Sequence, residues 1–118
     1  MVPLMLYVGK KWHERWAFVD SGATYSIFHP KEISHAGLNY QEGKPRKIIV
    51  GNGAFIDVYF FSLPAQIGGE AFTAEIGFSE HLTVGFNLIG RKDVFEKFRV
   101  CFSDAERKIT FQVLNLVS

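Results

Sequence analysis

The chain has 118 residues, 47% of them hydrophobic, which fits one compact domain spanning residues 1–118 and excludes a disordered chain. Its 13 Lys and Arg against 12 Asp and Glu leave a formal charge of +1, so charge gives no reason to expect nucleic acid or a membrane as a partner. No apolar run is long enough to span a bilayer and the first residues lack a basic secretory leader, so we expect a cytoplasmic protein.

The first part of the chain has the pattern of short β-strands separated by turn residues. Three strands are expected there, at residues 4–8, 12–20 and 25–28. A turn at residues 9–11 should join the first two strands. Pro30 suits the first turn of a helix and Gly37 suits the residue that ends one, so one or two helical turns are expected between them.

The rest of the chain continues this pattern, with glycine-rich turns between apolar runs. Further strands are expected on both sides of Gly51-Asn52-Gly53, at 63–67, 71–76 and 84–90, and as a closing pair within 99–117. Val94, Phe95 and Phe98 fall at helical spacing, which predicts a short helix near the C-terminal end. The single cysteine, Cys101, excludes an intrachain disulfide and is expected to be a small buried hydrophobe. So many short strands predict an all-β barrel or sandwich.

The stretch FVDSGATYSIF, residues 18–28, places an acidic residue at the end of an apolar strand. A carboxylate is tolerated there when the backbone amides of a tight turn donate hydrogen bonds to it. Gly22 has no side chain and lets the backbone pass close to Asp20, and the hydroxyl of Ser21 can tie the turn to a neighbour. The stretch therefore predicts one rigidly held carboxylate in an apolar setting. An ordinary Asx-type turn is the simpler alternative.

Residues 18–23 resemble the Asp-Thr/Ser-Gly-Ala/Ser signature of aspartic proteases, and the rest of the chain is similar to the single-domain, retroviral-type (retropepsin-like) subunit of that family. The Gly51-Asn52-Gly53 hairpin falls where the family has its flap. The stretch Asn87-Leu88-Ile89-Gly90-Arg91 resembles the family's apolar-apolar-Gly element, and the closing strand pair resembles the end of its chain. The resemblance implies an all-β closed barrel of the acid-protease type, with one short helix after the apolar-apolar-Gly element.

The activity that the resemblance implies is peptide hydrolysis, which needs two carboxylates facing one water. The chain has four aspartates, and only Asp20 lies in an Asp-Ser-Gly stretch. Asp57, Asp93 and Asp104 are expected to be solvated. The second carboxylate would then come from a second copy of the chain, which predicts a symmetric homodimer.

The expected function is therefore an aspartic endopeptidase that cleaves extended, rather apolar polypeptides and needs no cofactor. Asp20 is the expected catalytic residue, with Ser21, Gly22 and Ala23 as its support. Gly51, Asn52 and Gly53 are expected to cover the substrate, although a plain surface hairpin is an alternative. Because Ala23 lacks the hydroxyl that some relatives carry there, we expect activity to extend toward mildly acidic or near-neutral conditions.

Arg91, the histidines and some of the phenylalanines are further candidates for contacts in or near the site. In retroviral relatives, an Arg at the position of Arg91 pairs with an Asp at the position that Thr24 occupies here, so that ion pair is not expected. The four histidines show no ligand spacing, and no metal site is expected. Some phenylalanines near Phe28, Phe55 or Phe86 could line apolar substrate pockets.

Two other classes of function compete with the enzyme. The chain could be a peptide-binding module on the same fold, which would hold a peptide without cutting it. It could also be a structural β-barrel that uses its aromatic surface for assembly.

Overall fold

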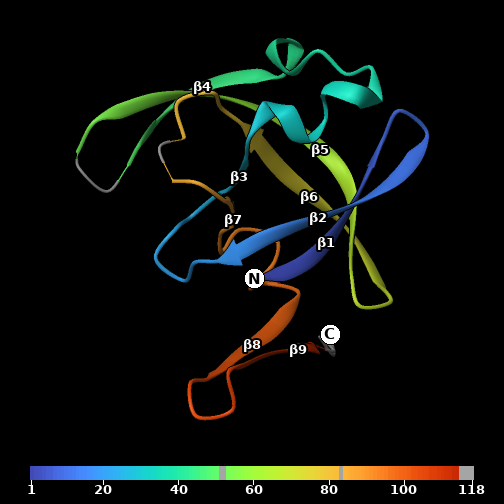
Figure 1. Ribbon diagram of the computed structural model, residues 1–118, viewed down its shortest axis with the longest axis vertical. Coiled ribbons are helices and arrows are strands. Elements are labelled where there is room, and N and C mark those ends of the chain that lie inside the picture. Colours follow the sequence, from blue (N-terminus) through green and yellow to red (C-terminus); the bar gives the residue numbers. More distant parts are fainter. Residues whose placement is uncertain (51–52, 83, 115–118) are drawn as a thin grey trace.

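Six strands close into a β-barrel, and a seventh extends it (Figure 1). The computed structural model describes residues 1–50, 53–82 and 84–114. The strands are β1 (Val2–Val8), β2 (Lys11–Val19), β3 (Ser26–Phe28), β4 (Lys44–Ile49), β5 (Phe55–Ile67), β6 (Glu70–Phe78), β7 (Asn87–Ile89), β8 (Phe98–Ser103) and β9 (Lys108–Val113). The predicted all-β barrel is therefore confirmed at the level of fold class.

The barrel closes in the order β1-β2-β7-β3-β6-β5, and β5 pairs back to β1 through Met5 with Gln66 and Leu6 with Ala65. The sheet is mixed, because β2 runs parallel to β7 and β3 runs parallel to β6, while the other pairs are antiparallel. Strand β4 lies outside the closed ring and pairs with β5. Strands β8 and β9 form a separate two-stranded sheet, which lies below the barrel in Figure 1.

The first hairpin shows how local sequence sets the register. Val8 pairs with Lys11, which leaves Gly9 and Lys10 as a two-residue loop with φ of 60° and 64°. Two positive φ values in a two-residue loop define a type I′ turn, whose twist matches that of the flanking strands. The register places Leu4, Leu6 and Val8 inside the barrel on alternate positions of β1.

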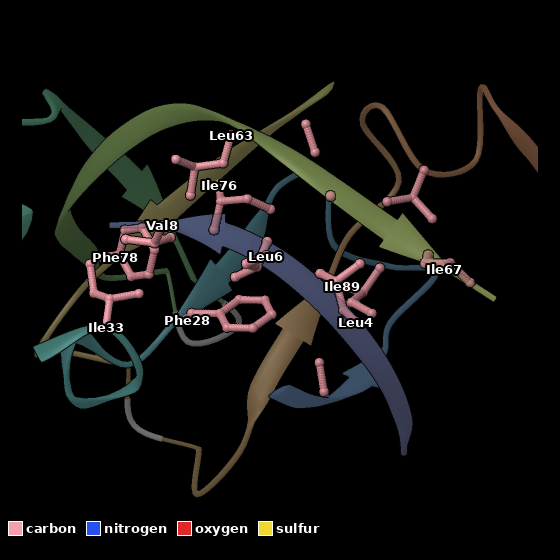
Figure 2. Packing of buried hydrophobic residues seen from close by; sticks show 14 of the residues in the cluster. Leu4, Leu6, Val8, Phe28, Ile33, Leu63, Ile67, Ile76, Phe78 and Ile89 are labelled. Carbon is pink, nitrogen blue, oxygen red and sulfur yellow. The ribbon is translucent and has the colours of Figure 1, made fainter. Parts of the chain in front are cut away.

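Two hydrophobic clusters stabilise the fold. The larger one fills the barrel, where Leu4, Leu6, Phe28, Phe78 and Ile89 meet (Figure 2). The smaller one lies beneath β4 and β5, and its buried members are Ile27, Ile56, Val58, Phe60 and Leu82. Strand β3 belongs to both clusters, because Ile27 and Phe28 point to opposite faces of the sheet.

The predicted short helix near the C-terminal end is wrong. Residues 92–97 form turns, and the described part of the chain contains 3-10 turns but no α-helix. Asp93 has a φ of 67°, in the left-handed region that interrupts a right-handed helix, and its Oδ2 accepts a hydrogen bond from the Glu75 N–H at 2.8 Å. The tertiary contact with β6 therefore overrides the helical spacing of the apolar residues.

The other helical prediction is confirmed in a tighter form. The stretch between Pro30 and Gly37 forms two 3-10 turns, at Pro30–Glu32 and Ser34–Ala36, and Gly37 ends the second with a φ of 79°. A third 3-10 turn spans Tyr40–Glu42. Among residues 1–50, 53–82 and 84–114, no helix is long and apolar enough to cross a membrane.

Two predictions about strands and one about burial need correction. The strand expected at 84–90 is shorter, because β7 spans only residues 87–89. The strand expected at 63–67 is not separate from the strand that follows Gly53, because both belong to the continuous strand β5. Cys101 is exposed rather than buried. The β8–β9 sheet packs only one face on the barrel, through residues such as Val100 and Phe111, so Cys101 on the other face meets solvent.

The barrel core generates a stability prediction. Phe78 is fully buried and packs against the rings of Phe28 and Phe61, so replacing it with alanine leaves a cavity. We expect Phe78→Ala to lower the free energy of unfolding by about 3–5 kcal/mol, measured by urea denaturation. Phe102→Ala is the matched control, because that ring is 49% exposed and should cost far less. Equal losses in the two variants would contradict this account of the core.

Candidate active site

Asp20 lies directly after β2 in a loop whose own amides hold it. The Gly22 N–H donates to Oδ1 of Asp20 at 2.9 Å, and the Ala23 N–H donates to the Asp20 carbonyl at 3.2 Å. The side chain is partly buried, whereas Ser21 is exposed. The amide contact expected from the sequence is present. It is also the hydrogen bond of an Asx turn, so the surroundings of the loop must decide what the carboxylate does.

Residues 89–92, the clasp, begin within the second motif of the resemblance and hold the Asp20 loop through backbone hydrogen bonds. Strand β7 lies between β2 and β3, the two strands that the Asp20 loop joins. The Ile89 carbonyl accepts from the Asp20 N–H at 2.9 Å, and the Arg91 N–H donates to the Ala23 carbonyl at 2.9 Å. The Lys92 N–H continues the series, donating to the Thr24 carbonyl at 2.8 Å. Backbone bonds from residues 89–92 therefore fix both ends of the loop.

Gly90 makes this close approach of the two segments feasible. A Cβ atom at this position would lie 2.3 Å from the Tyr25 carbonyl oxygen, which is backbone and cannot move aside cheaply. The Gly90 N–H donates to the Ser26 hydroxyl at 3.0 Å. The glycine of the apolar-apolar-Gly element is thus required by packing against the Asp20 loop.

A cleft of about 790 Å³ opens beside Asp20. The loop after β2 lines one wall and the β4–β5 hairpin the other, and both lie on the same side of the barrel in Figure 1. Most of the lining is apolar, and Asp20 is the one carboxylate in it among the described residues. The lining residues are Asp20, Gly22, Ala23, Thr24, Tyr25, Ile27, Lys47, Ile48, Ile49, Val50, Phe55, Leu82, Val84 and Leu88.

The hairpin expected to act as a flap is formed by β4 and β5. Near its tip, the Val50 N–H donates to the Ala54 carbonyl and the Gly53 N–H donates to the Val50 carbonyl. Gly53 is exposed with a φ of 83°, as a turn of this kind requires. Gly51 and Asn52, also expected to cover the substrate, lie outside the described residues.

The three phenylalanines considered as pocket residues have different positions. Phe55 lines the cleft from the hairpin and is 62% exposed. Phe28 is buried in the barrel core. Phe86 packs against the ring of Phe18 at a centroid distance of 4.9 Å and is not part of the cleft wall.

The remaining aspartates are not among the residues that line the cleft. Asp57 is exposed and pairs with Lys47 at 3.0 Å, and Asp104 is exposed, both as expected. The expectation that Asp93 is solvated is wrong, because Asp93 is partly buried and accepts the hydrogen bond from Glu75 described above.

Arg91, His13 and His29 each form a hydrogen bond with a backbone group. Arg91 is exposed and forms no ion pair within the described ranges, while its backbone binds Ala23. His13 and His29 each hydrogen-bond a backbone carbonyl. Across the residues that the structure describes, no group of three or more His, Cys, Asp and Glu side chains could hold a metal ion.

Sequence reasoning missed two buried polar residues that brace the site. Asn87 donates from Nδ2 to the Trp16 carbonyl at 3.0 Å, and its Oδ1 accepts from the His29 N–H at 2.9 Å. Ser26 accepts from Gly90. Both lie in otherwise apolar strands, and a polar residue inside such a run is the signal that could have identified them, because buried polar groups need partners.

No protein-family model matches the chain, and a search of curated proteins found no match to its sequence.

The position of Gly90 generates a second prediction. Gly90→Ala should cost about 1–3 kcal/mol of unfolding free energy, because the new methyl group forces the Asp20 loop away from residues 89–92. Gly69→Ala is the matched control, since a Cβ there meets nothing within 4 Å. Urea denaturation compares the two, and a Gly90→Ala protein as stable as Gly69→Ala would show that the clasp is loose.

Proposed function

We propose that the protein is a retropepsin-like aspartic endopeptidase that acts as a homodimer on extended, apolar polypeptides. One observation carries the proposal. The Asp-Ser-Gly loop and the Leu-Ile-Gly-Arg stretch, distant in sequence, are joined by backbone hydrogen bonds beside an apolar cleft that a glycine-tipped hairpin borders. An isolated Asx turn does not require such surroundings.

The proposed reaction uses Asp20 and the same residue of a second copy. Two carboxylates roughly 3 Å apart share one proton, because both cannot ionise together. The ionised carboxylate removes a proton from a water, the water oxygen bonds to the peptide carbonyl carbon, and the other carboxyl group donates its proton to the carbonyl oxygen. As the resulting diol collapses, the carboxyl group that took the proton from water donates it to the amide nitrogen and the C–N bond breaks. A diol hydroxyl gives its proton to the other carboxylate, which restores the shared proton of the pair.

The cleft wall supports the proposal that two copies are needed. One chain contributes a single carboxylate to the described cleft wall, and the other three aspartates lie elsewhere. A water-activating pair therefore requires a second molecule placed across a two-fold axis.

The apolar wall supports the proposed substrate class. Ile48, Val50, Leu82 and Leu88 offer aliphatic surface to side chains of a bound segment. Extended backbone can hydrogen-bond along the hairpin, as in strand addition.

A peptide-binding module on the same fold is the second candidate. The single carboxylate per cleft favours it, because a monomer with this site could hold a peptide without cutting it.

Asp20→Asn distinguishes the two candidates. The enzyme requires that cleavage of an unfolded, apolar-rich polypeptide is lost while sedimentation still reports a dimer, and Asp104→Asn, in an exposed turn, should keep full activity. Mixing equal amounts of wild-type and Asp20→Asn chains should leave about a quarter of the dimers active, since each site needs both copies. Activity that falls only to about one half would indicate that each chain works alone.

Ala23→Ser tests the expected pH range. A serine hydroxyl that donates to the paired carboxylates favours their charged form, so both limbs of the pH–activity profile should move to lower pH. Activity of the wild-type protein would then extend further toward neutral pH than that of the variant. An unchanged profile would contradict the role assigned to Ala23.

A further inference from the structure

Glu75, on β6, forms ion pairs with two segments that border the site. Its Oε1 lies 3.2 Å from Nη1 of Arg46 on β4, and its Oε2 lies 3.2 Å from Nζ of Lys92 in the turn after β7. Strand β4 is the first strand of the hairpin that borders the cleft, and the turn after β7 binds the Asp20 loop. One carboxylate therefore connects strand β4 with the turn after β7.

The carboxylate of this network is largely buried, and aromatic rings lie against its two cations. The Glu75 side chain is 21% exposed, and its Oε1 is buried with an ion-pair partner but no hydrogen bond. The Arg46 guanidinium carbon lies 5.3 Å from the ring centroid of Phe60 and 5.9 Å from that of Tyr25. The Lys92 ammonium lies 5.8 Å from the Tyr25 ring. Cation–π contacts in a partly desolvated site are stronger than exposed ion pairs.

Backbone contacts carry the network into the Asp20 loop. The Glu75 N–H donates to Asp93, the residue after Lys92, which fixes the turn against β6 at a second point. The Lys92 N–H binds the Thr24 carbonyl, and Tyr25, which follows, lines the cleft. Glu75, Arg46 and Lys92 do not themselves line the cleft.

We infer that Glu75 is a positioning residue that holds the hairpin strand β4 at a fixed place relative to the Asp20 loop. Its function follows from the proposed hydrolase, in which substrate must contact the hairpin and Asp20 together. Arg91 forms no ion pair among the described residues, whereas the next residue, Lys92, pairs with Glu75. Losing it should weaken substrate binding more than it slows the chemical step.

Glu75→Gln tests this inference because it keeps the size of the side chain and removes its charge. Amide hydrogen exchange should become about three- to tenfold faster in β4 and at Arg91 and Lys92, with the β1–β2 hairpin unchanged. The KM for a peptide substrate should rise by a similar factor while kcat changes less. If Glu75→Gln only unfolded part of the protein, the active fraction and therefore kcat would fall while KM stayed the same.

Two controls keep the test decisive. Glu106→Gln removes a carboxylate from an exposed pair with Lys108, far from the site, and should change neither exchange nor KM. Arg46→Lys keeps a cation facing Glu75, so it should behave more like wild type than Arg46→Met does. Equal effects of Arg46→Lys and Arg46→Met, or unchanged exchange and KM in Glu75→Gln, would overturn the inference.

The exchange measurement separates this inference from the proposed function. If the chain cleaves no peptide but Glu75→Gln speeds amide exchange both in β4 and at Arg91 and Lys92, the hydrolase proposal is wrong. The inference that Glu75 holds these two segments together then stands. If cleavage is found and the two segments stay independent, the hydrolase stands and the positioning role of Glu75 is wrong.

Discussion

The structure depends on the close backbone contact between the Asp20 loop and residues 89–92. Strand β7 lies between β2 and β3, and Gly90, directly after it, allows the close approach to the Tyr25 carbonyl because it has no side chain. The same contact gives hydrogen-bond partners to backbone groups at both ends of the loop, at Asp20, Ala23 and Thr24. The same backbone contact therefore helps to close the barrel and to position the Asp20 carboxylate.

This arrangement leaves a mostly apolar cleft with one carboxylate among its described lining residues. Its walls are preformed and apolar, so little backbone ordering is needed when a peptide enters. A single fixed acid cannot act as base and as acid in the same step, and the proposed pairing of two molecules supplies what one lacks. Association would then control activity, since an isolated chain would present a shaped cleft without chemistry.

Much of this could be predicted from the sequence, where local chemistry decides the outcome. The short run at residues 4–8 and the turn residues 9–11 indicated the first hairpin, and Asp-Ser-Gly indicated a carboxylate held by amides. The predicted helix failed because Asp93 takes its left-handed conformation in contact with β6, which no local spacing records. Glu75 escaped notice for the same reason: a charged residue normally implies solvent, and its two cationic partners come from distant segments.

The exposed position of Cys101 on the β8–β9 sheet has a practical consequence. The chain has one thiol, and it meets solvent on a sheet that packs beside the barrel rather than within it. A maleimide dye can therefore be attached at a single known place without entering the hydrophobic interior. Energy transfer between donor-labelled and acceptor-labelled chains would then report association directly in dilute solution.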